Sequence, residues 1–264
     1  MGRRRSLLPL SLLVAGALAC ATDAEPNVMT VTARDFAFEA PDTVAAGLTT
    51  IRLQNQGPEF HHVQLIRLED GHTHAEFFEA LQGGPPPAWV REVGGPNTPM
   101  PGGTSEATLT LEPGNYVIVC FIPSPDGVMH VAKGMSHPFV VGGGDAAARP
   151  AAAPAPDVVA TLTDYDFTFS DSLRAGRQVV RVRNDAAQPH EMFIVRLNEG
   201  VTPDQFASWV ETQDGPPPAE PIGGTTAIAN GLSNDLELDL APGEYLLICF
   251  VPDASDGRPH LAHG

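Results

Sequence analysis

Two stretches of this sequence each place a cysteine and a histidine after a run of apolar residues. The first, CFIPSPDGVMHVAKGM, runs from Cys120 through His130 to Met135. The second, CFVPDASDGRPHLAHG, begins at Cys249 and contains His260. A thiolate, two imidazoles and a weakly bound thioether make the donor set of a copper site that transfers electrons. Zinc has little use for the methionine. The donor types therefore predict copper.

The remaining histidine of each set must come from an earlier segment. His61 stands just after Asn55, where a predicted strand ends and the chain turns back, and His190 holds the same place in the second half. The adjacent His62 has Glu191 as its counterpart, so we expect His61 to be the ligand and His62 to face solvent. The predicted metal ligands are His61, Cys120, His130 and Met135 at the first site and, bound more weakly, His190, Cys249 and His260 at the second.

The chain repeats itself over most of its length. LTLEPGNYVIVCFIP (109–123), for example, returns as LDLAPGEYLLICFVP (238–252). A length of 264 residues favours about two domains. We therefore expect a first copy over 27–141 and a second copy over 157–264, joined by the Gly/Ala/Pro-rich linker 142–156.

Most local signals within each copy are those of β-strands. Residues 49–55 and 178–184 alternate apolar with polar side chains and are rich in β-branched residues, as half-buried strands require. Pro-Gly turns precede the continuous apolar runs 116–122 and 245–251, which predict strands buried on both faces. The sequence therefore predicts an all-β fold of two small sandwiches in tandem.

One short helix interrupts each predicted sandwich. Thr73 with Glu76, and Thr202 with Gln205, match the capping box that starts a helix. Apolar residues four apart follow each cap, so we expect one face of each helix to cover its sandwich.

The order N-x-G-x-x-x-H, then P-G-x-Y-x-x-x-C-x-x-P, then H-x-x-x-G-M resembles the cupredoxins, the plastocyanin and azurin class of blue copper proteins. The resemblance covers nearly all of 27–141 and, more weakly, 157–264. It implies a Greek-key β-sandwich, one copper held by the residues at His61, Cys120, His130 and Met135, and the transfer of single electrons. Residues 121–129 make the segment between cysteine and histidine longer than in the family, so a distorted copper geometry stays open.

The chain carries a strong negative charge, with 32 acidic against 15 basic residues and a net charge of −17. Such a surface repels phosphate backbones, which argues against nucleic-acid binding and favours a redox protein partner with a basic surface. The sequence holds no nucleophile with a plausible triad, no phosphate-binding glycine loop and no recognisable carboxylate pair, so we do not expect an enzyme.

The first residues, MGRRRSLLPLSLLVAGALAC, have the order of a secretory signal peptide: arginines, an apolar stretch, then small residues. Removal of residues 1–19 would change the net charge from −17 to −20, because it removes three arginines and no acids. Cys20 follows the cleavage site as the cysteine of a bacterial lipobox does. Lipidation at Cys20 and free secretion both stay open, and we expect a periplasmic or extracellular protein that meets a membrane only through such an anchor. In an oxidising compartment the unpaired Cys120 and Cys249 are a liability unless a metal binds them.

Two other functions stay open at this point. One is a metal-free cupredoxin-like module for protein contacts at the cell surface, and the other is copper storage or delivery without electron transfer.

The second copy stops at Gly264, where the first continues with Met135 and an apolar segment. We therefore expect the second sandwich to lack its last strand, either because the chain is a fragment or because this copy is a degenerate partner of the first.

Overall fold

The computed structural model describes residues 25–81, 86–143 and 151–264. The predicted signal peptide, Cys20 and part of the predicted linker lie outside the described residues. The described part is built from strands, two short α-helices and three 3₁₀ turns, so the predicted all-β class is confirmed. Among these residues no helix is long and apolar enough to cross a membrane.

The first copy contributes nine strands and one α-helix. They are β1 (Asn27–Arg34), β2 (Ala37–Glu39), β3 (Thr43–Ala45), β4 (Gly47–Asn55), β5 (Gln64–Leu68), α1 (His74–Leu81), β6 (Val90–Gly94), β7 (Thr104–Leu111), β8 (Gly114–Val119) and β9 (Ser136–Gly142), with 3₁₀ turns η1 (Glu69–Gly71) and η2 (His130–Lys133).

The second copy repeats most of this order. Its elements are β10 (Val158–Thr163), β11 (Asp166–Phe169), β12 (Gly176–Asn184), β13 (His190–Leu197), α2 (Pro203–Thr212), β14 (Ala219–Ile228), β15 (Ser233–Leu240), β16 (Tyr245–Ile248) and the 3₁₀ turn η3 (His260–Ala262).

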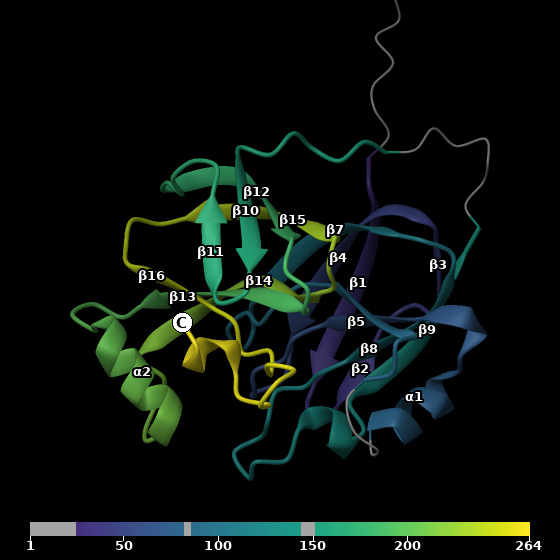
Figure 1. Cartoon of the computed structure of the whole chain (residues 1–264), viewed down its shortest axis with the longest axis horizontal. Helices are drawn as coiled ribbons and strands as arrows, with labels where there is room; N and C mark the ends of the chain where they lie inside the picture. Colours follow the sequence, from purple (N-terminus) through teal and green to yellow (C-terminus); the bar gives the residue numbers. More distant parts are fainter. Residues whose placement is uncertain (1–24, 82–85, 144–150) are drawn as a thin grey trace, which may run out of the picture.

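Both sheets run without a break through the two copies, which the sequence did not predict. The strand orders are β11-β10-β12-β15-β7-β4-β1-β2 and β16-β13-β14-β6-β5-β8-β9-β3. The copies meet where β15 pairs with β7 and where Ile228 of β14 pairs with Val93 of β6. Figure 1 shows this shared centre, with α1 and α2 on opposite sides of the molecule. Some strands that are neighbours in a sheet are not consecutive in the sequence, such as β4 and β7. The chain therefore crosses from one sheet to the other between them, as in Greek-key sandwiches.

Strand β8 shows why the apolar run before Cys120 places the thiol inside the sandwich. Its last four residues are all buried, as predicted for a strand covered on both faces. Because side chains alternate along a strand, Ile118 and Cys120 point into the core between the two sheets, whereas Val119 packs with Phe77 of α1 on the outer side. Burial of each large apolar side chain contributes about 1.5–3 kcal/mol. In the second copy Leu247 packs against the inner core, and Cys249, two residues later, is buried beside His190 and His260.

The two helices begin at the predicted capping boxes. The Thr73 hydroxyl accepts the Glu76 N–H at 3.3 Å, and the Glu76 carboxylate accepts the Thr73 N–H at 2.7 Å. Thr202 and Gln205 exchange the same two bonds at the start of α2. Phe206 of α2 is buried against its sheet, as Phe77 of α1 is, so each helix covers one outer face.

The two copies differ at the strand that leads to the cysteine. Strand β8 pairs with β5 on one side and β9 on the other. Within the described residues, β16 pairs only with β13 and lies at the edge of its sheet. The expectation that the second sandwich lacks its last strand stays a prediction.

Candidate metal centres

An asparagine at the end of a strand shapes the loop that presents the first histidine. The Asn55 amide donates to the Glu59 carbonyl at 2.8 Å, and its side-chain oxygen accepts the Gly57 N–H at 3.0 Å. Asn184 makes the equivalent bonds in the second copy, at 2.7 and 2.9 Å. The buried asparagine thus supplies hydrogen-bond partners for the backbone of the turn that leads to His61, which is fully buried.

A hairpin-like turn accounts for the long segment between Cys120 and His130. The Ser124 N–H donates to the Val128 carbonyl at 3.0 Å, so the extra residues turn outward and back. The His130 N–H then donates to the Ile122 carbonyl at 2.9 Å. In the second copy the His260 N–H bonds the Val251 carbonyl at 3.0 Å in the same way. The length of the loop therefore does not keep the histidine from the cysteine.

Three donor atoms of the first copy converge in the core, and we call them the first cluster: His61, Cys120 and His130. The Cys120 Sγ lies 3.4 Å from the His130 Nδ1, which lies 3.1 Å from the His61 Nδ1. All three side chains are fully buried. Met135, the predicted fourth ligand, is also fully buried and belongs to the same core as Cys120.

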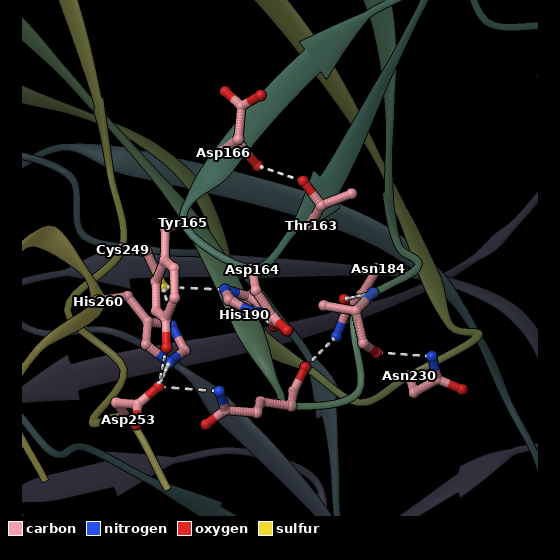
Figure 2. A network of polar contacts seen from close by, with 12 residues as sticks. Thr163, Asp164, Tyr165, Asp166, Asn184, His190, Asn230, Cys249, Asp253 and His260 are labelled. Carbon is pink, nitrogen blue, oxygen red and sulfur yellow. Dashed lines mark hydrogen bonds and ion pairs between the residues drawn. The ribbon is translucent and has the colours of Figure 1, made fainter. Parts of the chain in front are cut away.

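The second copy forms an equivalent set, the second cluster: His190, Cys249 and His260. The Cys249 Sγ lies 3.3 Å from the His260 Nδ1 and 3.8 Å from the His190 Nδ1. Figure 2 shows these three side chains together, with Asp164 beside the His190 ring. In each cluster the ligand atoms lie within 4.8 Å of one another, close enough for one metal ion to bind all three.

Carboxylates hold the far side of the histidine rings, and the sequence prediction missed them. Asp35 lies 3.1 Å from the His61 Nε2, and Asp164 lies 3.1 Å from the His190 Nε2. Glu59 lies 2.9 Å from the His130 Nε2. A carboxylate on one ring nitrogen fixes the ring and makes the other nitrogen a better metal ligand. The recurrence of the aspartate in RDF (34–36) and TDY (163–165) was the available signal.

Aromatic rings cover the second histidine of each cluster. Phe36 meets the His130 ring edge-on at 5.4 Å, and Tyr165 meets the His260 ring edge-on at 5.6 Å. Both aromatics have a positive φ, 64° and 65°, which is uncommon for residues with a side chain. Strained residues of this kind persist where the surroundings hold them in place, often beside a functional site.

Burial sets the protonation states of the donors. It raises the pKa of the Cys120 and Cys249 thiols to about 12, so both stay protonated at neutral pH unless a cation stabilises the thiolate. Burial also lowers the pKa of His61 and His260, which keeps each imidazole in the neutral form that binds metals. A bound cation would therefore be needed for either thiol to ionise at neutral pH.

The expectation that His62 faces solvent is wrong. Its side chain is half-buried, and the His62 Nε2 accepts the N–H of Phe121 at 2.9 Å. Its counterpart Glu191 does the same for Phe250, at 2.8 Å. Burial lowers the pKa of His62 to about 3 and raises that of Glu191 to about 7. The two residues have the same role, because each accepts the N–H of the residue that follows the cysteine. A histidine and a glutamate are different residue types, so comparison of the two repeats did not reveal this shared role.

No protein-family model and no curated protein matches the chain. Among solved structures, sodium-dithionite-reduced auracyanin from the photosynthetic bacterium Roseiflexus castenholzii is similar at 23% identity over 45% of this chain and 98% of its own, with a TM-score of 0.31. Auracyanin A from Chloroflexus aurantiacus, described as a "blue" copper protein, has 22% identity over 45% and 100% of the two chains, with a TM-score of 0.33. A copper-containing nitrite reductase from Thermus scotoductus covers 89% of this chain and 61% of its own at 15% identity and a TM-score of 0.27.

At these identities and TM-scores the similarities carry no argument about chemistry, which rests on the residues of the chain itself. Because an enzyme is among the similar structures, the expectation that the chain is not an enzyme gains no support from them and stays a prediction.

The donors in both clusters fit copper. Each cluster offers one thiol and two imidazole nitrogens in a buried site. These ligands favour copper over hard cations such as Mg²⁺ and Ca²⁺, which prefer oxygen ligands. The sequence prediction left copper at the second cluster uncertain, and the structure gives that cluster the same three donors. The assignment of each residue as a ligand stays a prediction.

Proposed function

We propose that the chain is an exported copper protein of the cupredoxin type that carries single electrons at His61, Cys120, His130 and Met135. The observation that carries the proposal is the convergence of three fully buried soft donors, with their Nδ1 and Sγ atoms turned toward one another. Bound copper supplies a centre that alternates between two oxidation states. We further propose 27–141 and 157–264 as the two units, each with its own cluster.

The surroundings of the first cluster keep the ligands in place during electron transfer. Asp35 and Glu59 fix the two imidazole rings from outside, and the His62 ring holds the peptide after Cys120. A ligand set that moves little between oxidation states needs little reorganisation, which suits electron transfer better than storage or release. This preorganisation favours an electron carrier over the storage alternative.

The second cluster binds copper more weakly in this proposal. His260 lacks a close carboxylate on its Nε2, since Asp253 lies 3.7 Å away and the atom has no hydrogen-bond partner.

Export and partnership follow from the sequence. A signal peptide over residues 1–19 sends the chain to the periplasm or beyond, with lipidation at Cys20 as one mode of attachment. The net charge of −17 favours a redox partner with a basic surface, which it attracts over a range that salt shortens.

Copper titration of the purified full chain tests the proposal. We expect an intense thiolate-to-copper absorption and a copper(II) paramagnetic signal that disappear on one-electron reduction and return on reoxidation. Cys120→Ser should remove the contribution of the first cluster. Weak copper(II) absorption that this substitution leaves unchanged, or a chain that takes up no copper, would overturn the proposal in favour of a metal-free module. A copper-loaded chain that cannot be cycled would favour storage.

A further inference from the structure

The two clusters are linked through the centre of the molecule by the seam, which consists of residues 93–99 of the first copy and 222–228 of the second. Asn97 donates its N–H to the Gly224 carbonyl at 3.0 Å, and Thr226 donates its N–H to the Gly95 carbonyl at 2.9 Å. Gly94 of the first copy has a positive φ, and a Cβ on it would lie 2.0 Å from the Asn234 Oδ1 and 2.6 Å from the Ile228 Cγ2, both of the second copy. Glycine at this position is therefore what allows the two copies to approach so closely.

A short series of bonds leads from the first cluster to the seam. His61 is joined through the peptide of His62 to Val63, whose N–H donates to the Pro96 carbonyl at 3.0 Å. Pro96 is bonded to Asn97, which is buried. One hydrogen bond thus separates the backbone of a predicted ligand from the Asn97 side chain.

A second hydrogen bond continues to the other cluster. The Asn97 Nδ2 donates to the Glu191 Oε2 at 2.9 Å. Glu191 directly follows His190, and its Oε1 accepts the N–H of Phe250, the residue after Cys249, at 2.8 Å. We call this route the seam path. It consists of covalent bonds and two hydrogen bonds, without a through-space gap, and it runs from His61 through Val63, Pro96, Asn97 and Glu191 to His190.

The carboxylate in this path is costly to the fold. Glu191 is only 7% exposed, and among the described residues no lysine, arginine or histidine forms an ion pair with it. A buried acid without a cation destabilises a protein relative to a neutral side chain. The counterpart His62 accepts from the equivalent peptide N–H, that of Phe121, and among the described residues its side chain forms no hydrogen bond across the seam. Support of the peptide alone therefore does not require a carboxylate that also reaches Asn97.

We propose that the seam path couples the two copper sites, so that an electron accepted at one cluster passes within the same chain to the other. This inference rests on the proposed function, since it needs copper at both clusters. In the step, one electron leaves the reduced site and enters the oxidised site, and no bond is made or broken. The chain would then exchange electrons at one end and relay them through Asn97 and Glu191.

Rapid partial reduction of the copper-loaded full chain tests the coupling. Cys120→Ser and Cys249→Ser, measured separately, first identify the absorption of each site. After mixing with less than one equivalent of reductant, we expect the two bands to redistribute at a rate that does not depend on protein concentration. Asn97→Ala, which removes the donor to Glu191, should slow the redistribution several-fold.

A matched control separates the path from the packing of the seam. Gln64 is buried and donates across the same seam to the Ala227 carbonyl at 3.0 Å, but it forms no hydrogen bond with Glu191. Gln64→Ala should leave the rate unchanged. If Asn97→Ala fails to fold, Glu191→Gln provides a second variant, because a glutamine of the same shape cannot accept both hydrogen bonds; it should also slow the rate.

Each outcome bears on a different claim. Redistribution that scales with protein concentration, or equal slowing by Gln64→Ala and the path variants, would overturn the coupling while the copper bands leave the proposed function intact. A chain without copper bands would overturn the proposed function and the coupling with it.

Discussion

The two clusters share their inner donors and differ in what surrounds them. The first has Met135 in its core and a glutamate, Glu59, on the far side of its second histidine. The second has Gln188 at the place of Glu59, and this amide donates instead to Asp253 at 2.9 Å. The repeat has thus kept the three atoms that define a copper site and changed the groups that tune it. We expect the same metal at both clusters with different affinity and reduction potential.

The largest change in copper affinity should come from the loss of one of the histidine or cysteine ligands of a cluster. Loss of an outer partner costs about 10–100-fold in metal affinity, so His61→Ala should weaken copper binding at the first cluster by more than that. His190→Ala should do the same at the second cluster only. Calorimetric or competitive copper titration measures both.

His62→Ala is the control for this pair, because its ring holds a peptide and does not point into the cluster. It should shift the first absorption band slightly and cost far less copper affinity than His61→Ala does. Equal losses from His61→Ala and His62→Ala would mean that the wrong histidine has been assigned.

The contrast between His62 and Glu191 should give the two copies opposite pH responses in the metal-free chain. Burial raises the pKa of Glu191 to about 7, from 4.5. The raised pKa means that the folded chain holds this proton more tightly than the unfolded chain, so the stability is fully present below about pH 4.5 and is lost as pH rises to about 7. The loss is on the order of 3 kcal/mol at one pKa unit per 1.36 kcal/mol. Glu191→Gln should therefore raise the urea midpoint at pH 8 more than at pH 5.

His62 provides the opposite case. Burial lowers its pKa to about 3, so its contribution is present above about pH 6.5 and is lost as pH falls toward 3. His62→Gln should raise the urea midpoint more at pH 5 than at pH 8. Glu199, which is exposed, is the matched control for Glu191. Glu199→Gln should leave the urea midpoint unchanged at both pH 5 and pH 8. Midpoints with the same pH dependence in all three variants would contradict the burial of these groups.

Exchange of the outer groups should make each cluster resemble the other. Glu59→Gln removes the carboxylate from the His130 Nε2 and should cost the first cluster about 10-fold in copper(II) affinity. Its reduction potential should rise, because the negative charge that stabilises the oxidised state is gone. The reciprocal Gln188→Glu should lower the potential of the second cluster. Redox titration of each band measures both changes, and shifts of the same sign would contradict the account.

The smallest effect should come from the methionine. Met135→Leu conserves volume in the core and should cost less than about 1.5 kcal/mol of stability. If Met135 is a weak ligand, the first band should shift while copper stays bound. A spectrum identical to that of the unchanged chain would remove Met135 from the ligand set.

Much of this fold could be predicted from local sequence. The alternation along 49–55, the apolar run before Cys120 and the capping boxes at Thr73 and Thr202 each depend on neighbouring residues, so they could be recognised directly. The convergence of the donors could be predicted because the strand that ends at Asn55 and the strand that ends near Cys120 open at the same end of a sandwich.

The parts that could not be predicted depend on contacts between distant segments. The two copies approach closely at Gly94, where a Cβ would meet Asn234 and Ile228 of the second copy, and nothing in the local sequence identifies these distant partners. The role of His62 was concealed because its counterpart Glu191 is chemically different yet accepts the same type of N–H. Asp35 and Asp164 recur at equivalent places, but only the fold shows that they reach the far side of the histidine rings.

Copper content per chain, measured together with absorption in the full chain and in the variants Cys120→Ser and Cys249→Ser, tests the central claim most directly. The account predicts one copper at each cluster, an intense band from each thiolate, and loss of a different band in each variant, with the first cluster filling at lower copper concentration. Copper that binds without a thiolate band, or bands that survive both substitutions, would contradict it.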